Sequence, residues 1–203
     1  MNATIESTLA ALKRRGFDAY AVKNAEEATA LVLSLIGKEE TVTFGGSATL
    51  KETGVIDTLK AEGYTVYDRN DVPPSERAEF AKAHFFTDWY LMSSNAVTEE
   101  GELLNLDGIG NRVASLVFGP KNVIVIAGRN KIVPDMDAAY TRVRTVAAPK
   151  NAQRFPISTP CKQTGECADC FCPDTVCASF VHTRFCRPPR RVRVILLDGD
   201  FGY

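Results

Sequence analysis

The feature that most constrains the fold of this chain is a regular alternation of short apolar strands with helical segments. Residues 122–128, NVIVIAG, are the plainest strand, because a run of β-branched residues lies between two turn signals. Further strands are expected at residues 17–22, 41–46, 64–68, 88–94, 101–108 and 190–200. Apolar residues at helical spacing indicate helices at 5–16, 24–37, 47–63, 74–86, 111–119 and 134–149.

Strands that alternate with helices of about 10–15 residues are typical of crossover units. We therefore expect an α/β fold with a mostly parallel sheet and helices on both faces. The chain has 203 residues, of which 45% are hydrophobic, so it is long enough for one well-filled core. We expect a single domain over residues 1–203, with a cysteine-rich segment at residues 149–190 and a closing strand after it.

Charge and hydropathy argue against several classes of partner. The formal net charge is -1, so no overall basic field favours nucleic acid. The first twenty residues lack the basic start, long apolar run and small-residue cleavage site of a signal peptide. No apolar stretch approaches the roughly 20 residues that cross a bilayer. We therefore expect a cytoplasmic protein that binds neither nucleic acid nor membrane.

A glycine-rich loop follows the strand at residues 41–46 and opens the next helix. In open α/β sheets, ligands bind outside the carboxyl ends of the strands, which is where this loop should lie. Backbone N–H groups and hydroxyls there suit a phosphate or a carboxylate, and the candidate ligands are Gly45, Gly46, Ser47 and Thr49. The loop is neither a P-loop nor a dinucleotide fingerprint. The alternative is a tight turn in which the serine only caps the helix.

Three further strand ends supply charged candidates. Glu99 and Glu100 are adjacent carboxylates, one of which could act as a general base or nucleophile if it were desolvated; solvated loop residues are the alternative. Arg112, within DGIGNR, could bind a carboxylate through two hydrogen bonds. Arg129 and Lys131 add positive charge after the strand at 122–128. Together these loops indicate a small anionic metabolite, a carboxylate or a phosphate, as the partner.

All six cysteines lie between residues 161 and 186, whereas the first 160 residues contain none. Four of them follow the spacing Cys161-x5-Cys167-x2-Cys170-x6-Cys177, and Cys172 and Cys186 are additional. Four thiolates within such a short segment can wrap one tetrahedral zinc ion or one iron–sulfur cluster. Free or redox-switching thiols are an alternative, as are disulfides. The cofactor therefore stays open between a zinc ion, an iron–sulfur cluster and none.

Four segments in this order resemble the LUD-domain family, which is named for lactate utilisation. They are FGGSATL, NAVTEEGELLNLDGIGNRV, GRNKIVPDMDAAYTRVRTVAAP and TPCKQTGECADCFCPDTVC, and the similarity runs from about residue 5 to the end of the chain. Within that family the chain is most similar to a single-domain, cysteine-containing branch. The resemblance implies a fold related to ribose-phosphate isomerases, glucosamine-phosphate deaminases and CoA-transferases.

The resemblance also implies a function and a set of residues. Family members act in the oxidation of L-lactate to pyruvate beside iron–sulfur partner subunits. The matching positions are Gly46, Ser47, Thr49, Glu99, Asp107, Gly108, Gly110, Arg112, Asn130 and Lys131, with Cys161, Cys167, Cys170 and Cys177 as the recurring cysteines. Glu99 is the candidate catalytic residue, but Glu100 stands where many relatives have a threonine.

Three functions are compatible with the sequence. The first is a component or accessory of L-lactate or 2-hydroxy-acid oxidation that binds an anionic metabolite. The second is a non-catalytic regulatory subunit that senses a metal or a thiol state, and the third is a sugar-phosphate isomerase or CoA-transfer-like enzyme. Related sheets often pair, so a homodimer is a further expectation.

Overall fold

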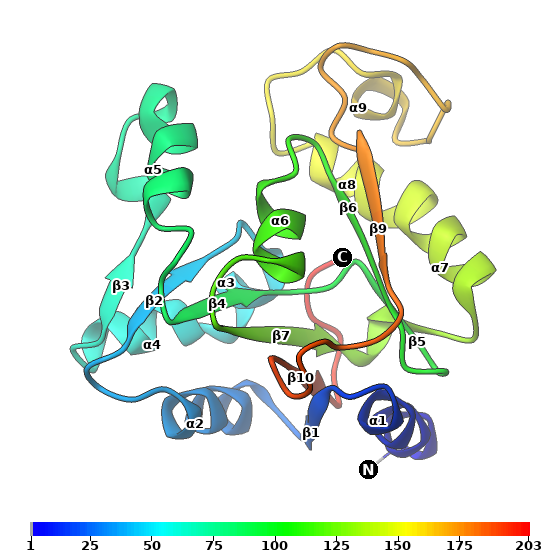
Figure 1. Cartoon of the computed structure of the whole chain (residues 1–203). Helices are drawn as coiled ribbons and strands as arrows, with labels where there is room; N and C mark the ends of the chain where they lie inside the picture. The colour runs from blue at the N-terminus through cyan, green and yellow to red at the C-terminus, as the bar shows by residue number, and fades with distance from the viewer. Residues whose placement is uncertain (1) are drawn as a thin grey trace.

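Six strands form one parallel sheet in the order β1–β10–β7–β4–β2–β3, in a computed structural model that describes residues 2–203 (Figure 1). The strands are β1 Asp18–Val22, β2 Thr41–Phe44, β3 Thr65–Tyr67, β4 Trp89–Met92, β7 Asn122–Gly128 and β10 Val192–Leu197. All five strand pairs are parallel. The predicted α/β fold with a mostly parallel sheet is therefore confirmed.

A second, four-stranded sheet, in the order β8–β5–β6–β9, packs beside the first. Its strands are β5 Ala96–Thr98, β6 Leu103–Asp107, β8 Ile132–Val133 and β9 Ser179–Thr183. Strand β6 is antiparallel to both β5 and β9. The sequence predicted only β6, because β5 and β8 have three and two residues, and β9 lies in the cysteine-rich segment, where no strand was expected. Part of the cysteine-rich segment is thus a strand.

Helices cover both faces of the parallel sheet, as predicted. They are α1 Ala3–Arg14, α2 Ala25–Leu35, α3 Ala48–Thr53, α4 Val55–Ala61, α5 Arg77–Ala83, α6 Asn111–Val117, α7 Met136–Arg142, α8 Ala148–Ala152 and α9 Pro160–Thr164, with short 3-10 turns at Arg69–Asp71, Pro74–Glu76 and Arg129–Lys131. Polar side chains fix several starts: Asn24 accepts a hydrogen bond from Glu27 N, and Asp135 from Ala138 N. Within residues 2–203 no helix combines the length and the apolar character that crossing a membrane requires.

The predicted helix at residues 134–149 is longer and less regular than expected. It begins at Met136, passes through a π-helical turn at Val143–Ala147, and continues to Ala152. Pro149 does not end it, because proline is tolerated in the first turn of the new segment α8.

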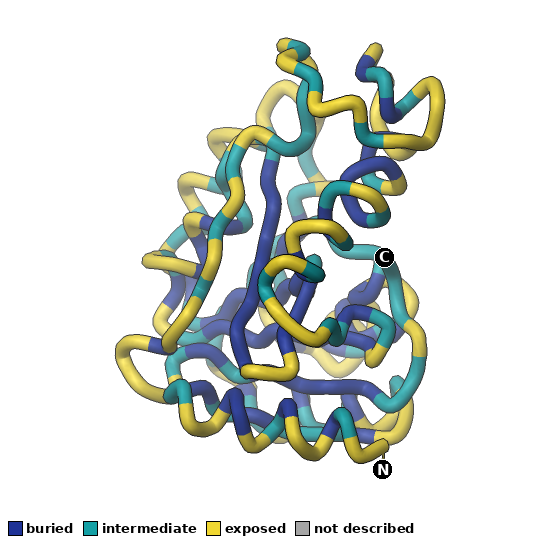
Figure 2. The backbone as a smooth tube through the Cα atoms, turned by 90° about the vertical axis from the view of Figure 1, so that its right-hand side faces the viewer, coloured by how far each residue is buried: buried dark blue, intermediate teal, exposed yellow. Residues whose placement is uncertain are grey.

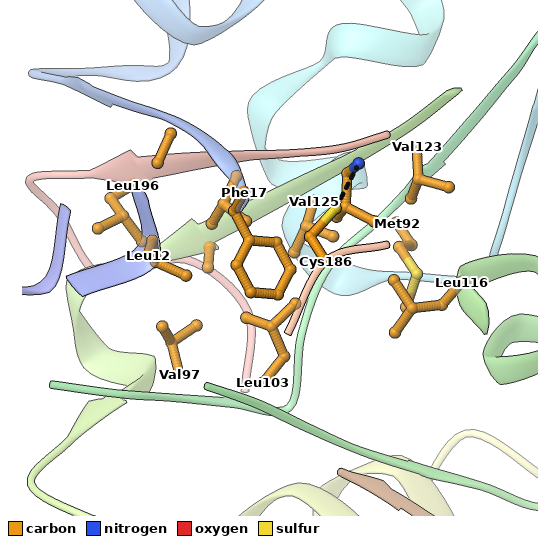
Figure 3. Packing of buried hydrophobic residues seen from close by; sticks show 14 of the residues in the cluster. Leu12, Phe17, Met92, Val97, Leu103, Leu116, Val123, Val125, Cys186 and Leu196 are labelled. Carbon is orange, nitrogen blue, oxygen red and sulfur yellow. Dashed lines mark hydrogen bonds between the residues drawn. The ribbon is translucent and has the colours of Figure 1, made fainter. Parts of the chain in front are cut away.

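Two hydrophobic clusters lie on opposite faces of the parallel sheet. Side chains alternate along β7, so Val123 and Val125 point to one face while Ile124 and Ile126 point to the other. The first cluster packs α1, α6 and the second sheet (Figure 3), and the second packs α2, α3 and α4. Helix α1 accordingly alternates buried and exposed residues along its length, next to the N label in Figure 2.

Candidate functional site

Three neighbouring strands of the parallel sheet end at the candidate site. In the order β7–β4–β2, their carboxyl ends are followed by Lys131, Ser93 and the glycine loop that holds Thr49. Because parallel strands all point the same way, residues that follow them meet at one edge of the sheet. Sequence reasoning placed all three segments at strand ends but did not single out Ser93, because it assigned that residue to the end of the strand at 88–94, whereas β4 ends at Met92.

Lys131 is the most unusual side chain at this edge, since it is only 3% exposed. Its Nζ donates hydrogen bonds to Thr49 Oγ1 at 2.8 Å and to Ser93 Oγ at 2.9 Å. No ion pair joins it to a carboxylate within residues 2–203. Burial, together with the nearby cation Arg142, lowers the pKa of Lys131 to about 7. A buried ammonium group without a counter-ion is stabilised by any anion that reaches it.

The glycine loop approaches other parts of the site closely. A Cβ atom at position 45 would lie 2.5 Å from Tyr90 Oη, and one at position 46 would lie 2.6 Å from Arg69 Nη2. Gly45 and Gly46 thus leave room for these side chains. Ser47 caps α3, since its Oγ accepts a hydrogen bond from Leu50 N at 3.3 Å. The alternative interpretation of the loop, a turn with a serine cap, is therefore part of the structure.

Asp107 and Arg112 form a second, internally paired group. Asp107 Oδ1 accepts hydrogen bonds from Ile109 N and Gly110 N, and Oδ2 accepts one from Arg112 N. Arg112 Nε lies 3.3 Å from Asp107 Oδ2, while its Nη2 donates to Leu106 O. Asp107 thus holds the loop in shape and neutralises most of the charge of Arg112.

Some of these groups line one cavity of about 50 Å³, which we call the inner pocket, whereas Thr49, Gly45 and Asp107 lie behind its lining or next to it. Its polar lining includes Ser47, Ser93, Arg112, Lys131, Arg154 and Tyr203. Arg154 Nη1 donates to Tyr203 Oη at 3.0 Å, and Tyr203 Oη donates to Asn151 Oδ1 at 3.1 Å. No sequence pattern indicated Arg154 or Tyr203, because they come from segments outside the strand-end loops that were expected to bind a ligand.

Other predicted residues support the site without lining the inner pocket. Asn130 holds the C-terminal segment, donating through Nδ2 to Gly202 O and accepting through Oδ1 from Phe201 N. Gly110 takes a left-handed conformation with φ of 82°, which starts α6 without a strained side chain. Gly108 lines a larger hollow of about 260 Å³ next to the inner pocket.

Glu99 lies elsewhere. It is exposed in the turn between β5 and β6, where its N donates to Val133 O. Glu99 and Glu100 line a separate shallow hollow beside Arg15, which caps the C-terminal end of α1. Arg15 Nε donates a hydrogen bond to Glu100 O. The structure does not bring Glu99 together with the inner pocket. Its assignment as a catalytic residue stays a prediction.

Four cysteines line a third space of about 250 Å³, which we call the cysteine hollow. They are Cys161, Cys167, Cys170 and Cys177, the same four that the sequence selected. Neighbouring groups contact three of their sulfur atoms. Arg144 Nη2 donates to Cys167 Sγ at 3.6 Å. The Thr159 hydroxyl lies 3.4 Å from Cys161 Sγ, and the Thr175 hydroxyl lies 3.0 Å from Cys177 Sγ. Thr175 lines both this hollow and the one next to the inner pocket.

The other two cysteines are separate. Cys172 is half-buried in the loop, and a hydrogen bond with Cys170 raises the pKa of its thiol. Cys186 lies in the hydrophobic core beside Phe17 and Val125 (Figure 3), where its Sγ accepts a hydrogen bond from Val192 N at 3.4 Å. All six thiols are free, and no three metal-ligating side chains are gathered for a metal ion in the part of the chain that the structure describes.

Comparison with known proteins agrees with the fold. A crystal structure of a DUF162 family protein from Deinococcus radiodurans is similar, with a TM-score of 0.56, 14% sequence identity, and 96% of each chain covered. None of the curated proteins matches this chain. The family model described as the LUD domain matches residues 5–197. The chain therefore belongs to the LUD-domain family, and is in general terms a lactate-utilisation-type protein.

Proposed function

We propose that this protein binds a small anionic metabolite, a carboxylate or a phosphate, in the inner pocket. The single observation that supports this proposal best is Lys131, a buried cation with two hydroxyl partners and no carboxylate partner in residues 2–203. Buried charges are stable only when they are paired, so the pocket favours a ligand that brings negative charge. Arg112 and Arg154 add cationic groups to the same lining.

Calorimetric titration with sodium sulfate tests this proposal, because the charge of sulfate is constant around neutral pH. We expect saturable binding at one site, and Lys131→Gln should weaken it by about 100-fold. Lys121→Gln is the matched control, since that side chain is exposed and does not line the inner pocket. Binding that is unchanged in Lys131→Gln, or no binding to the unmodified protein, would contradict the proposal.

We further propose that the binding serves L-lactate or 2-hydroxy-acid oxidation to pyruvate, as a component or accessory of an iron–sulfur enzyme. Such an oxidation releases two electrons, so a partner subunit or a bound centre must accept them. Co-purification with an iron–sulfur subunit, and lactate-dependent reduction of the complex, test this role. A chain that binds anions but neither associates nor supports reduction would instead be a sensor, the second candidate.

The cysteine hollow is the basis of a second proposal, a thiol-bound centre. Four thiols face one space, and Arg144 and two threonine hydroxyls are placed to stabilise thiolates there. The sulfur atoms are not gathered for a metal ion, so binding would draw the loop together. Analysis for zinc, iron and acid-labile sulfide after purification without oxygen tests it, with Cys172→Ser as the control for Cys170→Ser. Metal-free protein with six titratable thiols would refute it.

A further inference from the structure

The inner pocket opens into two larger spaces that run in series along the edge of the fold. The middle hollow, of about 260 Å³, shares Gly46, Arg112 and Arg154 with the inner pocket. The outer hollow, of about 630 Å³, shares Arg69 and Ile109 with the middle one. The three spaces therefore adjoin one another in series, and we call them together the groove.

The middle hollow contains a second group of cations. Three guanidinium groups line it, from Arg69, Arg112 and Arg154, against the single carboxylate of Asp107. That carboxylate pairs with Arg112. Neither Arg69 nor Arg154 forms an ion pair within the residues that the structure describes. Two uncompensated cations remain there, in addition to Lys131 in the inner pocket.

Both uncompensated guanidinium groups end beside Gly46. A Cβ atom at that position would lie 2.6 Å from Arg69 Nη2 and 3.8 Å from Arg154 Nη2. The two groups therefore approach one point of the groove, next to the loop that leads to Lys131. Two cations held together in this way repel each other and are stabilised when an anion binds between them. This point is a second anion-binding position, distinct from the one at Lys131.

The outer hollow has a different chemistry. Aromatic side chains dominate its lining, with Phe44, Phe80, Phe85, Phe86 and Tyr90 among them. Phe86 and Ile109 are 81% and 82% exposed, so this end of the groove leaves large apolar side chains in contact with water. An aromatic group bound there would cover apolar surface and could stack on these rings.

This inference rests on the proposed anion site. We propose that the groove binds an elongated organic anion with two linked anionic groups and an aromatic body. One anionic group pairs with Lys131 and the other with Arg69 and Arg154, while the body occupies the outer hollow. Lactate, with a single carboxylate and three carbon atoms, would use only the inner pocket. An aromatic diphosphate ester is a ligand of this class, and adenosine diphosphate is the probe that represents it.

Calorimetric titration at pH 7 with sulfate, inorganic pyrophosphate, adenosine diphosphate and adenosine tests the proposal. We expect pyrophosphate to bind about tenfold more tightly than sulfate, and the nucleotide about tenfold more tightly than pyrophosphate, with no binding of adenosine alone. Arg69→Gln should remove the advantage of pyrophosphate while the affinity for sulfate stays within about twofold. Equal affinities for sulfate and pyrophosphate would overturn the inference.

A blocking variant tests the aromatic body separately. Ala114 is exposed on α6 and lines the outer hollow, so Ala114→Trp should fill that space. We expect the affinity for adenosine diphosphate to fall to that for pyrophosphate. Val117→Trp is the control, because Val117 is exposed on the same helix but outside the hollow. An unchanged preference for the nucleotide in Ala114→Trp would refute the aromatic body, whereas failure of every anion to bind would refute the anion site itself.

Discussion

The inner pocket and the cysteine hollow lie side by side, yet they are built in opposite ways. Regular strands place the inner pocket, and Thr49, Ser93 and Lys131 are all buried and joined by hydrogen bonds. The cysteine hollow is carried by a loop with one five-residue helix, and Cys167 and Cys170 are only half-buried there (Figure 1). The polar groups of the pocket are already joined before a ligand arrives, whereas the sulfur atoms of the loop, within the described residues, are not gathered for a metal ion. Preorganised charge lowers the cost of ligand binding.

The largest contrast should be in stability. Ile124→Ala removes a fully buried side chain from the centre of β7 and should lower the free energy of unfolding by about 2–5 kcal/mol. Phe171→Ala, in the cysteine loop, removes a side chain that is fully exposed and should change it by less than about 0.5 kcal/mol. Urea denaturation of both variants measures the difference. A large loss of unfolding free energy in Phe171→Ala would show that the cysteine loop is firmly packed.

The next effect should be on ligand affinity. Lys131→Gln keeps a group that can hydrogen-bond to Thr49 and Ser93 but removes the charge, so sulfate affinity should fall by about 100-fold. Thermal unfolding should occur at the same or a higher temperature, because a buried charge has been removed. By contrast, Cys177→Ser in the cysteine hollow should leave sulfate affinity unchanged. If it weakens sulfate binding as strongly, the two regions act as one site.

The pH dependence of binding should sharpen the same comparison. The pKa of Lys131 lies near 7 in the free protein, and an anion favours the charged ammonium form. Sulfate affinity should therefore be greatest below pH 7 and fall by about fivefold between pH 7 and pH 8, as the lysine loses its proton. Titrations at several pH values measure this, and Lys131→Arg, which stays charged, should flatten the profile. A flat profile in the unmodified protein would assign the binding to the arginines instead.

The smallest effect concerns the residue that orients Arg154. Tyr203→Phe removes the hydroxyl group that accepts a hydrogen bond from Arg154 and donates one to Asn151. We expect sulfate affinity to fall by about threefold, the value of one ordinary hydrogen bond. Tyr140→Phe, on the exposed side of α7, is the control and should have no effect. Equal effects of the two changes would mean that Tyr203 does not position the arginine.

The sequence predicted those parts of the fold and of the candidate site that depend on a local pattern of residues. Strand β7 and the glycine loop have clear periods and turn signals, so the parallel sheet and the place of Lys131 followed from them. Arg69, Arg154 and Tyr203 reach the groove from separate segments, and no local pattern records that convergence. Glu99 was assigned to a strand end because β5 is too short to recognise, and the turn that follows β5 carries it away from the pocket.

The position of β10 has a consequence for how the protein is made. Of the six strands of the parallel sheet it is made last, yet it lies between β1 and β7, and within residues 2–203 it is the only strand that pairs with β1. A nascent chain that has not reached residue 192 leaves β1 without a partner and one edge of β7 bare. Unpaired edges invite association with other chains. Both edges stay open until β10 has emerged from the ribosome, so a chaperone that shields strand edges would help most in that interval.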